Sequence, residues 1–284
     1  MIALWHKEIV MERKKIEQKA DKLRFDAIKM VHEGKDGHPG PALSIADIVT
    51  ALYYDIMHLD PKNPDWEDRD RFILSKGHAC PLYYAALADK GYFSGQIEHF
   101  GLRALGSRFQ GHPVMGRTAG VDMTSGSLGN GIAIGAGMAI AARYRKKDFR
   151  TFVIVGDGEL QEGICWEGIA LAAANKLDNL YVFVDHNGWQ SGGKLSEICG
   201  EANIAAKFKA FSWDVQEING HDPCEIKDSV QKAGQHKGPH AIICKTIKGK
   251  GVSFMENDNS WHKRVPTEEE LLTARKELVG GCDA

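Results

Sequence analysis

Hydrophobic and polar positions along the chain change their period several times, and these changes predict a series of helices. Apolar residues at helical spacing predict an amphipathic helix over residues 7–33, which the Gly- and Pro-rich residues 34–40 end. Ser44 can cap a second helix, Ile45 to Tyr54, with Asp47 at its third position. Further helices are predicted at residues 81–90, 128–145 and 164–175, and in the tail 266–278, where Thr267 is the cap and Glu270 stands three residues on.

Short apolar runs, typical of buried strands, lie between these helices. They predict strands at residues 71–74, 151–156, 180–185, 213–218 and 241–246, whereas residues 109–127 read as a long loop. Strands that alternate with helices indicate an α/β fold, a mostly parallel open sheet with helices on both faces. The chain shows no repeat and no obvious linker, so we expect residues 1–284 to form a single domain.

Composition excludes several classes of protein. A formal net charge of −2 argues against nucleic acid or a membrane as the main partner. None of the six cysteines forms a Cys-x-x-Cys pair, so neither a zinc site nor a redox motif is indicated, and a reducing cytoplasm is the expected compartment. The first 24 residues lack the apolar core of a signal peptide, and no stretch is long enough to span a membrane.

Two of the predicted strands end in oxygen-bearing side chains. Gly156-Asp157-Gly158 follows the strand at 151–155, and Asn187 follows the run at 180–184. The carboxyl edge of a parallel sheet is where ligands bind, and a carboxylate with an amide oxygen suits Mg²⁺. The segment after Gly158 reads as a helix start, which favours anions. Gly-Asp-Gly alone is also common in ordinary turns, so the second strand and Asn187 strengthen the assignment.

Four of the twelve histidines lie in Gly-rich breaks or loops rather than on apolar faces. These are His38, His78, His112 and His262. Imidazole donates or accepts protons near neutral pH, so a cluster of them could bind sugar hydroxyls and move protons. The plainer alternative is four hydrogen-bonded loop histidines. His221, in an Asn-Gly-His-Asp stretch, is expected to hold a turn.

Over nearly its whole length the chain resembles the N-terminal part of transketolase, which binds the diphosphate of the cofactor. The matching segments include Asp36–Gly40, Ser75–His78, Gly111–Pro113, Gly126–Gly129, the Gly-Asp-Gly region and Asn219–Asp222. The ending Thr246–Glu256 resembles the separate N-terminal subunit of split transketolases in bacteria and archaea. The resemblance implies the thiamine diphosphate-binding fold, with thiamine diphosphate and Mg²⁺ (or Ca²⁺ or Mn²⁺) as cofactors.

The resemblance also implies roles for individual residues. The metal ligands would be Asp157, Asn187 and the backbone carbonyl of Trp189, where full-length transketolases usually have Ile. Thiamine diphosphate would contact His78, Gly126, Ser127, Leu128, Gly158, Glu162, Asn187 and His262. The hydroxyls and carbonyl oxygen of the donor sugar would be bound by His38, His112 and His262, which would also assist proton transfer. Glu162 and Glu167 match glutamates that lie near the dimer axis in this family. The alternative is that both are ordinary solvated charges on a helix.

In this family a glutamate from a second domain triggers ionisation of the cofactor, and the resemblance places that domain on another chain. We therefore expect the pyrimidine-binding and C-terminal domains on a partner subunit of roughly 300 residues, in an α₂β₂ assembly acting on sugar phosphates. The alternatives are a transketolase for a branched or sulfonated sugar, another thiamine diphosphate enzyme (a 2-oxo acid dehydrogenase α subunit or a deoxyxylulose phosphate synthase), and a non-catalytic module.

Overall fold

The computed structural model describes residues 2–96, 99–200 and 203–280, with side chains from residue 13 onward. Its centre is a five-stranded sheet in which every neighbouring pair is parallel, in the order β1-β2-β3-β7-β6. The strands are β1 (Arg71–Leu74), β2 (Thr151–Gly156), β3 (Leu180–His186), β6 (Asp214–Asn219) and β7 (His240–Lys245). A short antiparallel hairpin, β4 (Trp189–Gln190) with β5 (Gly193–Lys194), follows β3.

Successive strand residues face two separate cores, as the strand period of two requires. Phe152 and Ile154 of β2 join one apolar cluster, and Val153 and Val155 join the other. Because a sheet covered on both faces needs apolar residues at every position, its strands read as continuous hydrophobic runs. The expected α/β fold with a parallel open sheet is confirmed.

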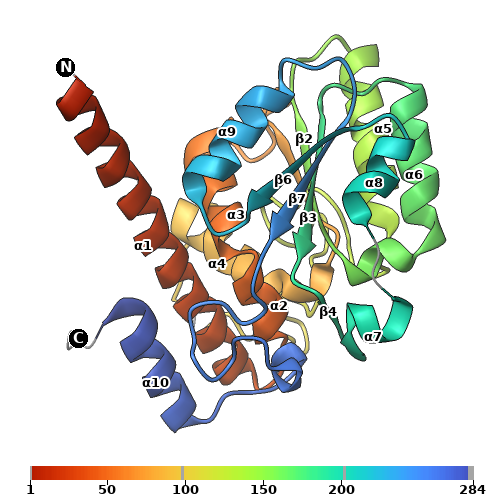
Figure 1. Ribbon diagram of the computed structural model, residues 1–284. Helices are drawn as coiled ribbons and strands as arrows, with labels where there is room; N and C mark the ends of the chain where they lie inside the picture. The colour runs from red at the N-terminus through yellow and green to blue at the C-terminus, as the bar shows by residue number, and fades with distance from the viewer. Residues whose placement is uncertain (1, 97–98, 201–202, 281–284) are drawn as a thin grey trace.

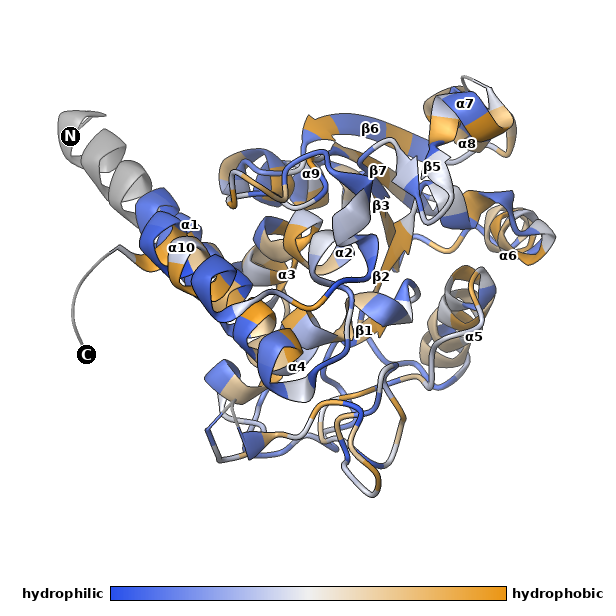
Figure 2. Ribbon diagram, turned by 90° about the horizontal axis from the view of Figure 1, so that it is seen from below, coloured by the Kyte–Doolittle hydropathy of each residue, from blue (hydrophilic) through white to orange (hydrophobic). Residues whose placement is uncertain are grey.

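Helices cover both faces of the sheet (Figures 1 and 2). One side carries α1 (Ile2–Gly34), α2 (Pro39–Ser44), α3 (Ala46–Ala51), α4 (Cys80–Lys90), α9 (Pro223–Ala233) and α10 (Glu268–Val279). The other side carries α5 (Asn130–Tyr144), α6 (Gly163–Ala174) and α8 (Ile204–Ala210). Shorter turns are a π-helical turn (Leu52–Ile56), α7 (Leu195–Cys199) and 3₁₀ turns at Gly77–Ala79, Gly158–Gln161 and Asn259–His262.

The small-residue helix predicted at 128–145 is present as α5, and it packs closely on α6. A Cβ atom added to Gly168 of α6 would lie 2.8 Å from the backbone nitrogen of Ala133, so only glycine allows this approach. The predicted cap of α10 is also confirmed. Thr267 and Glu270 form a reciprocal capping box, which satisfies two free backbone N–H groups.

Two local predictions are wrong, and two helices were missed. The chain is already helical from Pro39, so Ser44 ends α2 instead of capping a helix, and its hydroxyl donates to Asp185 (2.7 Å). The segment after Gly158 is a 3₁₀ turn, and α6 begins only at Gly163. Helices α8 and α9 were not predicted, although side-chain caps begin both.

None of the helices in the described residues is long and apolar enough to cross a membrane. Cys80, Cys165 and Cys244 are buried free thiols, while Cys282 lies outside the described residues.

Candidate active site

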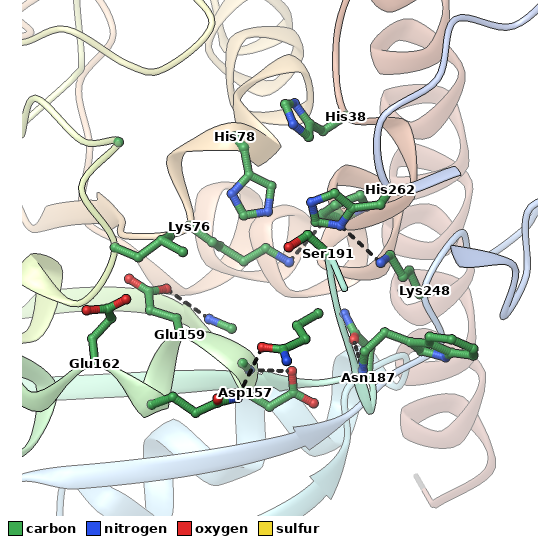
Figure 3. A pocket seen from close by; sticks show the side chains of 18 of the residues that line it. His38, Lys76, His78, Asp157, Glu159, Glu162, Asn187, Ser191, Lys248 and His262 are labelled. Carbon is green, nitrogen blue, oxygen red and sulfur yellow. Dashed lines mark hydrogen bonds between the residues drawn. The ribbon is translucent and has the colours of Figure 1, made fainter. Parts of the chain in front are cut away.

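Polar side chains after four neighbouring strands meet at the carboxyl edge of the sheet. Lys76 follows β1, Asp157 follows β2, Asn187 follows β3 and Lys248 follows β7. They line one cavity of about 370 Å³, a size usual for small-molecule sites. Its other lining residues include His38, Pro41, His78, His112, Gly126, Leu128, Gly158, Glu159, Glu162, Trp189, Gln190, Ser191 and His262 (Figure 3).

Asp157 and Asn187 lie side by side on adjacent strand ends. The Asp157 carboxylate, only 3% exposed, accepts backbone N–H groups from Gly158 (2.8 Å) and Gly188 (2.7 Å). The Asn187 amide oxygen accepts from the N–H of Trp189 (2.9 Å). Among the described residues no group of three or more His, Cys, Asp or Glu is placed so that it could hold a metal ion, so a metal here needs a mixed set of oxygen donors. One carboxylate, one amide and the Trp189 carbonyl fit Mg²⁺, which phosphate oxygens and water would complete.

Three of the four predicted histidines form a triangle of rings above this pair (Figure 3). The ring centres of His38 and His78 are 5.2 Å apart, and His262 lies 5.4 Å from each. His38 precedes α2, His78 lies in the 3₁₀ turn after β1, and His262 ends the last 3₁₀ turn. The breaks in the helices therefore bring distant histidines to one place.

The triangle is electrically neutral at pH 7. Burial, helped by Arg103, lowers the pKa of His38 to about 4, and burial, helped by Lys248, lowers the pKa of His262 to about 3. Burial and the charge of Lys76 hold the pKa of His78 well below its ordinary value. Neutral imidazoles offer both a donor and an acceptor nitrogen, which suits hydroxyl binding and proton transfer.

An anion would fit among these groups. The Lys248 amine donates to Asn259 Oδ1 (2.6 Å) and lies 3.0 Å from His262 Nδ1, and burial lowers its pKa to about 8. The buried Nδ1 of His38 has no hydrogen-bond partner among the described residues. A diphosphate group would supply counter-charge to Lys248, and the His38 nitrogen remains available to another polar group of a ligand. Gly158 allows Gln190 to pack closely against the cavity wall, because a Cβ there would lie 2.8 Å from the Cβ of Gln190.

The segment predicted to line the organic part of the cofactor reaches the cavity at Gly126 and Leu128. Gly126 has φ +138°, a backbone conformation that favours glycine, and a Cβ there would crowd the ring of His112 at 3.2 Å. Burial and the nearby Arg103 lower the pKa of His112. Ser127 is exposed, and its carbonyl accepts from the Asn130 side chain (3.1 Å).

The two predicted axis glutamates behave differently. Glu162 is exposed and lines the cavity, whereas Glu167, farther along α6, is exposed away from it. A third glutamate, Glu159, was missed. It is buried in the cavity wall, accepts from the N–H groups of Gly129 (2.8 Å) and Gly156 (3.1 Å), and burial raises its pKa.

Sequence reasoning also missed the two lysines of the cavity. Lys76 stands within the quoted Ser-Lys-Gly-His segment and Lys248 within Thr246–Glu256, so a basic residue just after a buried strand was the available signal. His221 lies outside the cavity lining. Its Nδ1 bonds Asp47 (2.6 Å) and its Nε2 accepts from the N–H of Ile247 (2.9 Å), so its ring joins two distant segments, whereas its backbone N–H donates to Asn219 within the expected turn (3.0 Å).

The fold and the cavity together define a class, the diphosphate-binding domains of thiamine diphosphate enzymes. The sequence profile described as "Transketolase, thiamine diphosphate binding domain" matches residues 15–283. The chain belongs to the transketolase family, which decides against the other thiamine diphosphate enzymes considered from the sequence.

The relatives include separately encoded subunits. The chain is 38% identical over 269 residues to a subunit of apulose-4-phosphate transketolase from Phocaeicola vulgatus, covering 94% of this chain and 95% of the relative. It is 43% identical over 243 residues to a subunit of 6-deoxy-6-sulfo-D-fructose transketolase from a Clostridium species, covering 85% and 88%. The transketolase structure from Campylobacter jejuni superposes with a TM-score of 0.87 at 35% identity, covering 93% of this chain and 43% of that one.

Proposed function

We propose that this chain is the diphosphate- and Mg²⁺-binding subunit of a thiamine diphosphate-dependent transketolase. The enzyme would transfer a two-carbon ketol unit from a ketose phosphate, or a ketose with another anionic end, to an aldose phosphate. The main support for this proposal is the cavity at the carboxyl edge of the sheet, where the oxygens of Asp157 and Asn187 lie below a triangle of neutral imidazoles.

Within this proposal the metal is held by Asp157, Asn187 and the carbonyl of Trp189. The diphosphate is held by His78, Gly158, Lys248 and His262. The rest of the cofactor is bordered by Glu162 and by residues 126–128. All of these residues except Ser127 line the cavity, which supports the assignment. When bound, thiamine diphosphate supplies the nucleophilic carbon and the electron sink.

His38, His112 and His262 act on the sugar. Their lowered pKa values keep the rings neutral at pH 7, so each ring has one N–H and one acceptor nitrogen. In His262 the Nδ1 atom is in contact with the Lys248 amine, so this ring offers the sugar its Nε2 atom. Hydrogen bonds from these rings would therefore orient the donor sugar.

The proposal includes a second chain that carries the pyrimidine-binding and C-terminal domains. Two relatives that are themselves named as subunits, each covered over 85% or more of its length, support it. An α₂β₂ assembly would place Glu162 and Glu167 near its axis, where exposed carboxylates can meet a partner. The assembly would work in the cytoplasm, in keeping with the buried free thiols.

The relatives named for apulose 4-phosphate and 6-deoxy-6-sulfo-D-fructose favour an unusual sugar as donor. The test is ketol transfer to an aldose phosphate from three donors: xylulose 5-phosphate, apulose 4-phosphate and 6-deoxy-6-sulfo-D-fructose. Each assay uses this chain alone and mixed with the chain encoded beside it, with Mg²⁺ and thiamine diphosphate.

Activity only in the mixture supports a split transketolase, and the preferred donor then identifies the substrate. Cofactor binding without transfer from any of the three donors would contradict the proposed reaction. Asp157→Ala in the same mixture is the control, because activity that persists in it cannot come from the proposed site.

A further inference from the structure

Asp185, the second-last residue of β3, is a buried carboxylate behind the cavity, where it contacts Lys76 and Asn187 of the cavity lining. It is 0% exposed and accepts hydrogen bonds from four side chains that come from four segments of the chain. The donors are Lys76 Nζ (2.5 Å), Ser44 Oγ (2.7 Å) and Asn187 Nδ2 (2.9 Å) on Oδ2, and Thr246 Oγ1 (2.5 Å) on Oδ1.

The contact to Asn187 fixes which end of the amide faces the metal position. Its NH₂ group donates to Asp185, and its oxygen accepts from the N–H of Trp189. Turning the amide over would place its oxygen against the Asp185 carboxylate and its NH₂ against the Trp189 N–H, so both contacts would become repulsive. The amide oxygen, the kind of atom that Mg²⁺ binds, is therefore held on the side of the Trp189 N–H, with the NH₂ group turned to Asp185.

The remaining contacts join the segments that surround the proposed diphosphate position. Lys76, which stands two residues before His78 and is only 2% exposed, donates to Asp185 and to the carbonyl of Pro41 (3.1 Å). Thr246 stands two residues before Lys248. One carboxylate thus ties the ends of β1 and β7 and the last residue of α2 to the end of β3.

We propose that Asp185 is a positioning residue for the metal site, holding the Asn187 amide with its oxygen toward the cation. The proposal rests on the proposed function, because it needs the metal at Asp157 and Asn187. The competing explanation is that Asp185 only neutralises the buried Lys76. The two explanations differ in what happens when both charges are removed together.

The experiment uses this chain with thiamine diphosphate and its partner chain, and follows Mn²⁺ binding by loss of the free-ion paramagnetic resonance signal. The variants are Asp185→Asn, Lys76→Met and the double variant. Asparagine at 185 both donates and accepts, so it allows Asn187 either orientation. The double variant leaves no lone buried charge and keeps the test valid where Asp185→Asn alone fails to fold. Asp122→Asn is the matched control, a buried carboxylate paired with Arg69 (2.6 Å) at the start of β1.

We expect the double variant to bind Mn²⁺ about 10–100-fold more weakly than Lys76→Met, the usual effect of losing a group that orients a metal ligand. Asp122→Asn should lose thermal stability but bind Mn²⁺ like the wild type. Double-variant affinity within about threefold of that of Lys76→Met would overturn the positioning role. A wild-type complex that binds no Mn²⁺ with thiamine diphosphate would instead overturn the proposed function, and this inference with it.

Discussion

Mild acid should destabilise this protein through the histidines of its own cavity. In the unfolded chain each histidine binds a proton with a pKa near 6.5. In the folded chain burial keeps the pKa of His78 well below that value, and it lowers those of His38 and His262 to about 4 and about 3. Below pH 6.5 the unfolded state therefore binds more protons, and stability falls as the pH falls.

The size of the effect follows from these shifts. One unit below the unfolded pKa, at pH 5.5, a histidine that stays neutral in the folded state costs about 1.4 kcal/mol relative to pH 7.5. His78 is the most enclosed of the three, so it should show nearly this full amount. All three rings keep some exposed surface, and solvent screening reduces the shares of His38 and His262, around which less protein is packed, to about 1 kcal/mol each.

The measurement is urea unfolding of the cofactor-free chain at pH 7.5 and pH 5.5, for the wild type and His78→Gln. The difference between the two pH values cancels the direct packing effect of the substitution and the titration of unrelated carboxylates. His78→Gln should shrink the loss of stability by about 1 kcal/mol. The matched control is His58→Gln, because residue 58 is exposed and should keep the wild-type difference.

An equal loss of stability in His78→Gln and the wild type would refute the reasoning, since His78 would then take up its proton in the folded state. A larger loss in His78→Gln would mean that His78 supports the fold more strongly in acid, which is the opposite sign.

Three further predictions concern the metal, the substrate and the fold. Asp157→Ala should abolish Mg²⁺-dependent thiamine diphosphate binding by calorimetry while leaving the circular dichroism spectrum unchanged; unaltered affinity would exclude Asp157 as a ligand. His112→Ala should lower turnover at least about tenfold with little change in cofactor affinity, and equal losses would make it a cofactor or structural residue. Gly137→Ala, where a Cβ meets nothing within 4 Å, should stabilise the chain by about 0.5–1 kcal/mol. Gly168→Ala should instead cost about 1–3 kcal/mol by urea unfolding, because its Cβ would reach the backbone of Ala133; equal effects of the two would argue against the close α5–α6 contact.

The strands of the sheet could be predicted because their signal lies within short stretches of sequence. Each central strand is buried on both faces, so it reads as an uninterrupted apolar run, and the ligand residues follow directly where the run stops. The same locality explains the error at Ser44. A hydroxyl before an apolar run is a good capping signal, but the partner of Ser44 is Asp185, 141 residues away.

In the candidate site, too, residues with a local sequence signal could be predicted and residues with distant partners could not. Its histidines occur where the backbone must turn, at Gly- and Pro-containing breaks, so the sequence alone marks them as candidates. The signal at Lys76 is weak and Asp185 carries none, because a lysine or an aspartate near a strand end is usually solvated. Here both are enclosed, and each is tolerated only because the other cancels its charge across 109 residues of sequence. The pairing exists only once β1 and β3 lie in one sheet, with β2 between them. Residues that bind a ligand can therefore be found from local pattern, whereas those that hold the ligand-binding groups in place become visible only in the assembled fold.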